Sequence, residues 1–262
     1  MSVTTQADLL DISRASVYYQ PIVNPEDIRA MNAIDEIYTA HPFYGSRRIR
    51  IALNQRGFSL CRDHVRRLMH IMCLEAVYPK RRIRTSSPGQ EHKVYPYLLK
   101  GLTIDHPNHV WGVDITYIRI EGGFVYLVAL IDWYSRYVIA WEVSVSLASD
   151  FCIATLERAL TIAVPDIHNS DQGAQLTDHG YTGILQGRHI QISMDGRGRC
   201  FDNIFTERLW RTVKYEDVYL KGYKDISAVR AGLSDYFSFY NNERPHQALN
   251  YRTPADVYFQ RK

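Results

Sequence analysis

The stretch that decides the fold runs from Asp171 to Lys214 and reads DQGAQLTDHGYTGILQGRHIQISMDGRGRCFDNIFTERLWRTVK. Its first acid, Asp171, ends the short apolar run 165–170, which reads as a strand. Its second acid, Glu207, lies in a helical pattern over 201–214, and 35 residues separate the two. The run His189–Met194 between them predicts another strand. The stretch therefore predicts a strand that ends at one carboxylate and a helix that carries another.

A third acid, Asp114, lies upstream within the strand-like run Trp111–Ile120. A carboxylate in an apolar strand is costly to bury unless it is paired or bound to a metal. Hard divalent cations such as Mg²⁺ prefer a few carboxylate oxygens together with phosphate oxygens of a substrate. Each acid also has a plain structural explanation: a solvated strand-edge residue, a turn residue and a solvated helix residue. As a set they predict a phosphoryl-transfer site with two ions, Mg²⁺ or Mn²⁺.

Five segments carry a resemblance to a known family. Three hold the acids: the WxVDITY pattern at 111–117, NSDQGAQ at 169–175 and SMDGRGRCFDNIFTERLWRTVKYE at 193–216. The others are YGSRRIRIALNQRGF at 44–58 and YNNERPHQALNYRTPADVY at 240–258. Together they resemble the second-frame (OrfB) transposases of insertion sequence family three, whose catalytic cores are related to retroviral integrases. Gln172 and Ala174 depart mildly from the family pattern and leave the acids untouched.

The resemblance implies an α/β fold with a ribonuclease-H-like mixed sheet and helices on both faces, preceded by a small helical DNA-binding region. It makes Asp114, Asp171 and Glu207 the catalytic, metal-binding residues of a DDE transposase. The expected activity is cleavage of 3′ ends at terminal inverted repeats, followed by strand transfer into a target. The expected partners are DNA, further copies of the chain and an upstream-frame (OrfA) product. The abrupt start of the chain fits fusion to that frame.

The order of elements predicted from the residues agrees with this fold. Three strands come first, Val110–Ile120, Phe124–Trp133 and Tyr137–Val145, with a hairpin turn at 121–123. Helices and strands then alternate, which favours a mixed sheet. The expected helices are 148–163, 175–186 and 201–213, and the last is 227–240, before an irregular tail. The expected parts of the chain are 1–77, a basic linker 78–105, the catalytic core 106–222 and the tail region 223–262.

Basic residues gather before the core. From His41 to Arg84 there are eleven Lys and Arg against two acids, although the net charge of the whole chain is only +3. This local excess is the electrostatic footprint of a nucleic-acid-binding surface, or alternatively a solvated basic helix face. A weak helix-turn-helix pattern at 7–19 and amphipathic helices over 25–40, 46–56 and 60–72 precede the linker. The expected DNA contacts here are Arg47, Arg48, Arg66 and Arg67.

Further basic residues follow the acids. Arg211 and Lys214 lie four and seven residues after Glu207, so a continuous helix would place both on the same face as Glu207. Both are predicted to hold DNA phosphates, Lys214 also because it matches a basic position of the family. Asn203 shares that face and is expected to orient the carboxylate. Arg244 is predicted as a DNA contact, with local packing as the equal alternative.

Several classes are disfavoured. The four cysteines form no CxxC pair, which favours a reducing, cytoplasmic compartment, and no apolar run approaches the length of a membrane span. Cys61, His64, His70 and Cys73 imitate a zinc set, but the two cysteines would lie about 18 Å apart on one helix. Two alternatives to a transposase remain: a ribonuclease-H-like hydrolase, and a DNA-binding fragment that regulates a longer fusion product.

Overall fold

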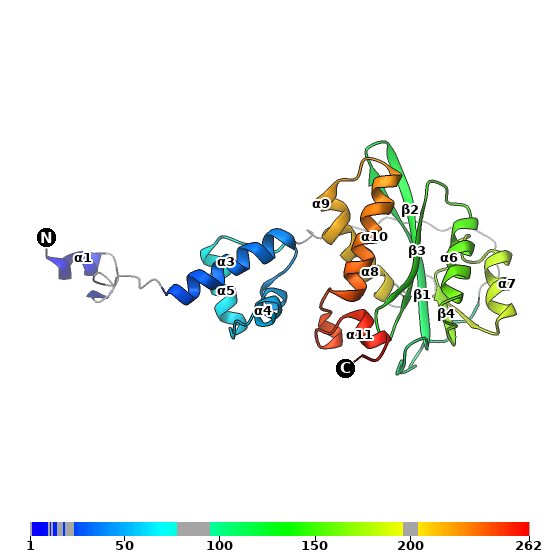
Figure 1. The fold of residues 1–262 in the computed structure, drawn as a ribbon, viewed down its shortest axis with the longest axis horizontal. Helices are drawn as coiled ribbons and strands as arrows, with labels where there is room; N and C mark the ends of the chain where they lie inside the picture. Colours follow the sequence, from blue (N-terminus) through cyan, green and yellow to red (C-terminus); the bar gives the residue numbers. More distant parts are fainter. Residues whose placement is uncertain are drawn as a thin grey trace. The chain divides into compact units, whose positions relative to one another are not determined.

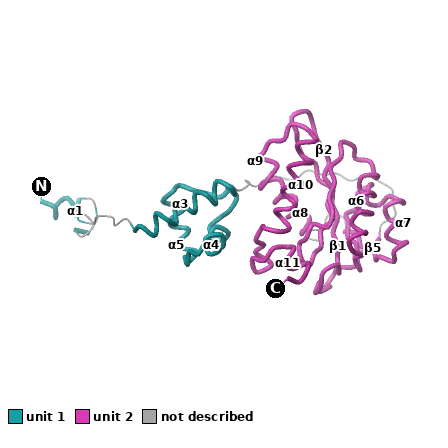
Figure 2. Tube along the Cα trace, viewed as in Figure 1, with its two compact units in different colours: residues 1–77 teal, residues 78–262 magenta. Residues whose placement is uncertain are grey.

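The computed structural model describes residues 2–9, 11, 13–14, 18, 24–77, 95–195 and 204–261. It divides into two compact units, 1–77 and 78–262, which are coloured separately in Figure 2. Most of the predicted turn and second helix at 7–19 lies outside the described residues, which show only α1 (Val3–Leu9) there. Among the described helices, none is long and apolar enough to cross a membrane.

The first unit packs three amphipathic helices, α3 (Pro25–Ala40), α4 (Ser46–Gln55) and α5 (Arg62–Ile71). Asn24 caps α3 and accepts a hydrogen bond from the Glu26 N–H, while Pro25 begins the helix with its fixed φ. Gly57 ends the turn after α4 with a φ of 87°, a conformation that favours glycine. The predicted helices are confirmed. The buried face of α3 includes Ala30 and Ala33, whereas Ile28 is 41% exposed.

The second unit is built on one five-stranded sheet with the order β3-β2-β1-β4-β5. The strands are β1 (Val110–Ile120), β2 (Gly123–Asp132), β3 (Val138–Ser144), β4 (Ile167–Ser170) and β5 (Gln191–Met194). The first three are antiparallel, and β4 and β5 run parallel to β1. The mixed sheet confirms the predicted fold class.

Helices cover both faces of this sheet, as Figure 1 shows. On one face lie α6 (Asp150–Leu160) and α7 (His179–Gly187), and on the other α8 (Ile204–Val213) and α10 (Ile226–Asn242). Because side chains alternate along a strand, Trp111 and Val113 join the core under α6, whereas Val110 and Ile118 join the core under α8. Asp114 has the same parity as Val110, so β1 directs it toward the face of α8.

Two predicted boundaries were wrong. The helix expected from Gln175 begins at His179, because Asp178 caps it by accepting the Gly180 N–H at 2.7 Å. The tail after 240 is not irregular throughout: a 3₁₀ turn, η2 (Gln247–Leu249), is followed by α11 (Pro254–Tyr258). A capping box between Thr253 and Asp256 begins α11. The Tyr258 hydroxyl donates to Asn108, 150 residues earlier, and so fixes the tail on the sheet unit.

Candidate active site

Asp114 lies in the middle of the central strand β1, facing α8. Its Oδ2 accepts a hydrogen bond from the indole N–H of Trp210 at 2.8 Å, and its Oδ1 accepts one from the Ile115 N–H at 2.8 Å. Trp210 lies on α8, three residues after Glu207. The hydrogen bond therefore links the strand that carries one acid to the helix that carries another.

Asp171 follows the last residue of β4. The pairing of β1 with β4 is parallel and aligns Gly112 with Asn169, so two residues further along each strand Asp114 and Asp171 are neighbours. The Gly173 N–H donates to Oδ1 of Asp171 at 2.9 Å. Neighbouring protein groups displace part of its water and raise the pKa of Asp171, although the side chain still reaches solvent. The end of a parallel strand is the usual position of site residues in such sheets.

Glu207 lies in the first turn of α8 with an exposed side chain. Its charge acts on Asp114, whose pKa is raised to about 7. The largest cause is burial, followed by the charge of Asp171; the Trp210 and Ile115 hydrogen bonds oppose the rise, and Glu207 adds to it. Asp114 thus senses both other acids, as expected for three carboxylates that converge on one site.

A hollow of about 220 Å³ is lined by two of these acids, Asp114 and Asp171; among the described residues that line it, Glu207 is absent. Within the described ranges, the one group of three or more His, Cys, Asp and Glu whose ligand atoms all lie within 4.8 Å is Asp105, His106 and His109. The ligand atoms of the acid trio are therefore more widely spaced than those of that group. Its donor set is made of oxygen atoms, and a raised pKa at Asp114 marks a place where a cation would relieve repulsion. The residues fit a hard divalent ion.

Lys214 lies near enough to Asp114 for that carboxylate to act on its ammonium group. Its Nζ is 4.8 Å from the ring centroid of Tyr117, and burial lowers the pKa of its ammonium group while Asp114 opposes that effect. The helix is not continuous through this point, because α8 ends at Val213 and a π-helical turn, η1 (Lys214–Val218), follows. Arg211 is exposed on α8. Asn203 lies outside the described residues.

The predicted DNA-contacting arginines of the first unit differ in their exposure and in their partners. Arg47 and Arg66 are exposed on α4 and α5, and Arg48 lies over the Tyr44 ring at 5.4 Å. Arg67 is exposed and donates to Asp27 at 2.6 Å. His64 also contacts Asp27, at 2.8 Å, so this histidine of the zinc-like pattern has a carboxylate partner within its own unit.

Arg244 lies in a buried ion pair. Its side chain is buried, and its Nε and Nη2 donate to the two carboxylate oxygens of Glu216 at 2.6 and 2.7 Å. The Tyr236 hydroxyl donates to the same carboxylate at 2.9 Å. This buried bidentate ion pair fixes the tail against η1, as the packing alternative for Arg244 expects.

Two further acids of the sheet unit, Asp132 and Asp195, have hydrogen-bond partners within the fold. Asp132 is fully buried and accepts hydrogen bonds from the Asn108 N–H and from the N–H and hydroxyl of Ser135. Asp195 accepts from the Asn169 amide at 2.8 Å. The residue that sequence reasoning missed is Trp210. Its spacing of three from Glu207 equally suits a core position, so no pattern marked its hydrogen bond.

This fold and site define a class: proteins with a ribonuclease-H-like catalytic core of the integrase type. Two family models, each described as an integrase core domain, match residues 104–200 and 188–254, and a model of an HTH-like domain matches 25–82. The fold is also similar to a chain in the cryo-EM structure of a simian T-cell lymphotropic virus intasome bound to the PP2A regulatory subunit B56 gamma. That match has a TM-score of 0.51 at 14% identity and covers 86% of this chain and 74% of that one.

The sequence relatives are transposases. The putative transposase InsK for insertion sequence element IS150 of Escherichia coli (strain K12) is 29% identical over 254 residues, 94% of this chain and 89% of the relative. The transposase for insertion sequence element IS629 of Shigella sonnei is 28% identical over 219 residues, 83% of this chain and 74% of the relative. The chain has an integrase core domain, is similar to insertion-sequence transposases over most of its length, and is an enzyme, a polynucleotidyl transferase of the DDE type.

Proposed function

We propose that the chain cleaves the 3′ ends of an insertion sequence at its terminal inverted repeats and joins those ends to a target strand. The observation that carries the proposal is the convergence of Asp114 and Asp171 on one hollow, with the Glu207 helix attached to Asp114 through Trp210. The transposase relatives and the integrase core support the same substrate class.

In this proposal Asp114, Asp171 and Glu207 hold two Mg²⁺ or Mn²⁺ ions. Such ions, when bound, activate the attacking oxygen and stabilise the leaving oxygen of an in-line displacement at phosphorus. Water first breaks the phosphodiester at the end of the element and frees a 3′-OH. That hydroxyl then attacks a second phosphodiester, forms a new one and releases the displaced 3′-oxygen. Neither step needs a nucleophilic side chain.

The remaining residues bind and orient DNA. Lys214 and Arg211 lie beyond Glu207 and are proposed to hold phosphates beside the acids. Four basic residues of α4 and α5 are proposed to bind the terminal repeat as a separate unit: the exposed Arg47, Arg66 and Arg67 and the half-buried Arg48. We also propose that the enzyme works as a homo-oligomer on paired ends, alone or fused to an upstream-frame product, beside the nucleoid.

The test is a strand-joining assay with Mg²⁺ or Mn²⁺ and short DNA ends of the element that encodes the chain. Wild type and Glu207→Gln are compared side by side, and only wild type is expected to give joined product. If neither joins strands, the assay is repeated with the upstream frame fused. Activity of the fusion alone would favour an enzyme that depends on its partner, and inactivity of both would favour a regulatory DNA-binding protein.

A further inference from the structure

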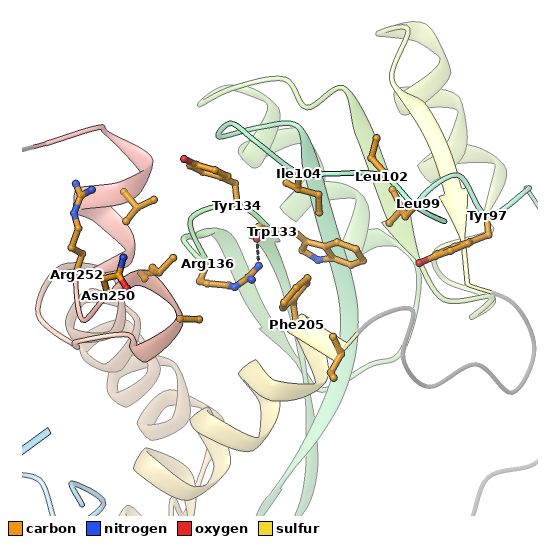
Figure 3. Close-up of a pocket in the computed structure, with 14 residues that line it drawn as sticks. Tyr97, Leu99, Leu102, Ile104, Trp133, Tyr134, Arg136, Phe205, Asn250 and Arg252 are labelled. Atoms are coloured by element: carbon orange, nitrogen blue, oxygen red, sulfur yellow. Dashed lines mark hydrogen bonds between the residues drawn. The ribbon is translucent and has the colours of Figure 1, made fainter. Parts of the chain in front are cut away.

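A cavity of about 670 Å³ lies in the second unit, apart from the hollow between the acids. Four segments form it: the stretch 97–104, the turn 133–136 after β2, the first turn of α8, and the tail around η2 and α11. Figure 3 shows aromatic side chains and arginines lining it together. Its volume is in the range that holds a small organic ligand or one nucleotide.

The cavity has aromatic surfaces suited to a planar ligand. Trp133 and Phe205 meet edge to face, with ring centroids 5.1 Å apart. The guanidinium of Arg136 lies over the Phe205 ring at 3.5 Å. Tyr134 is only partly buried, and its hydroxyl makes no hydrogen bond within the described ranges. Aromatic rings and a stacked guanidinium are the surfaces on which unpaired nucleobases stack.

The charge of the cavity is positive. Two arginines line it, Arg136 and Arg252, and no Asp or Glu does so among the residues described. Neither arginine forms an ion pair with a described carboxylate; their hydrogen bonds go to main-chain carbonyls, Arg136 to Trp133 and Arg252 to Asp256 and Arg261. Burial lowers the pKa of Arg136 to about 10, so its positive charge is present at neutral pH but poorly solvated. Such a cation favours an anionic ligand.

The cavity lies next to the acid site. The Trp133 indole packs so closely on Gly112 that a Cβ at that glycine would lie 2.2 Å from Nε1. Gly112 is two residues before Asp114 on β1, a separation of about 7 Å along a strand. Phe205 is two residues before Glu207 on α8. Helix α8 therefore carries residues of both the cavity and the acid site, and Trp133 of the cavity packs on the strand that carries Asp114.

We propose that this cavity holds one unpaired nucleotide of the DNA strand on which the acid site acts. Its base stacks on the ring of Tyr134, its phosphate pairs with Arg136 and Arg252, and the side-chain amide of Asn250 faces the base edge. Withdrawing a nucleotide from the duplex costs unstacking energy, which the stacking in the cavity offsets. The proposal rests on the proposed function, because it presumes that the acid site acts on DNA.

The test measures binding of the full chain, in a Glu207→Gln background that blocks cleavage, by fluorescence anisotropy with Mg²⁺. One probe is a blunt duplex of the element's end, and the other is the same duplex with its last three base pairs mismatched. We expect the unpaired end to bind about tenfold more tightly, since stacking of one base on an aromatic ring has that magnitude. Tyr134→Ala and Arg252→Ala are each expected to remove this preference and to change blunt-end affinity less than about twofold.

Two matched variants control for folding and for general loss of aromatic surface. Tyr134→Phe keeps the ring and is expected to keep the preference. Tyr219→Ala removes an exposed ring on α9 (Tyr219–Lys221), outside the cavity, and is expected to behave as the parent. Equal binding of the two probes by the parent, or an equal loss on both probes in Tyr134→Ala, would overturn the proposal. A cavity that receives a protein segment instead would leave both affinities unchanged in every variant.

A photocrosslink gives an independent readout. With 5-iodouracil at the unpaired positions, irradiation is expected to join the DNA to the peptides that contain Tyr134 or Phe205. Crosslinks confined to other peptides would contradict the proposal. Failure of the proposed function is separable, because strand joining is assayed in wild type. If the wild type joins strands but the chain shows no preference for unpaired ends, only the cavity proposal is contradicted. If the chain prefers unpaired ends but the wild type does not join strands, only the proposed function is contradicted.

Discussion

The indole N–H of Trp210 donates a hydrogen bond to Oδ2 of Asp114 across 2.8 Å, and so connects α8 to the central strand. This contact supports the charged form of a carboxyl group whose pKa burial and neighbouring acids raise to about 7. It also fixes the first turn of α8, and with it Glu207, beside the strand. We infer that Trp210 positions two of the three acids.

Replacing Trp210 with Phe is expected to slow strand joining about tenfold to a hundredfold, because a hydrogen bond to a charged group contributes about 1.5–3 kcal/mol. The pH at which activity is half-maximal is expected to rise, since the bond lowers the pKa of Asp114. Single-turnover rates from pH 6 to 9 measure both effects. Trp141→Phe, which alters an indole packed on Phe237, serves as the control. An unchanged pH profile in Trp210→Phe would assign the tryptophan to packing alone.

The acids are expected to be needed for chemistry and not for binding. Asp114→Asn and Asp171→Asn should each lower the joining rate by about a hundredfold or more, since each removes a charged ligand of the ions. Affinity for terminal DNA should change less than about threefold, because most of that affinity comes from phosphate contacts elsewhere. Rates and anisotropy measured on the same preparations check this, and substantial activity in either variant would remove that residue from the site.

Lys214 is predicted to contact a phosphate. Lys214→Ala should weaken DNA binding and reduce by about one the slope of log affinity against log salt concentration. Lys214→Arg should keep the slope. Lys224→Ala alters an exposed lysine that lines neither the cavity nor the hollow between the acids, and it provides the baseline. Identical slopes for Lys214→Ala and wild type would return Lys214 to a surface charge over the Tyr117 ring.

Arg244 is predicted to act on stability. Removing one partner of a buried ion pair leaves the other charge uncompensated, so Arg244→Ala should lower the free energy of unfolding by about 3–5 kcal/mol. All four tryptophans lie between 111 and 210, so their fluorescence in urea reports the sheet unit. The double variant Arg244→Met with Glu216→Leu should recover much of the loss. A stable Arg244→Ala with weakened DNA binding would restore the original prediction of a DNA contact.

His168 predicts an acid-sensitive core. It is fully buried beside the Tyr181 hydroxyl, and burial lowers its pKa from 6.5 to about 4. Below pH 6.5 the imidazole of His168 becomes protonated in the unfolded chain, whereas in the folded chain it stays neutral down to about pH 4. Stability should therefore fall by about 3 kcal/mol as pH drops across that window. Urea titrations at pH 7, 5.5 and 4.5 measure the slope, and His168→Gln should flatten it; parallel slopes would contradict the assignment.

The sequence alone predicted most of the helices and strands and proposed the three acids. Alternating apolar residues predicted β1, β2 and β3 within one or two residues of their observed bounds. Successive side chains of a strand point to opposite faces of the sheet, so the pattern repeats every two residues. The helices of the first unit followed from amphipathic spacing in the same way. Local side-chain chemistry also predicted turns and caps. The cap at Asp178 was not predicted, so the predicted start of α7 lies before its observed start at His179.

Only the tertiary structure decided which distant residues meet. Parallel pairing of β1 with β4 makes Asp114 and Asp171 neighbours, and the packing of α8 on β1 supplies the Trp210 hydrogen bond. The same packing buries Arg244 against Glu216 and encloses the cavity between the β2–β3 turn and the tail. None of these contacts has a local signature. Each depends on the alignment of segments far apart in the chain, which periodicity and spacing do not specify.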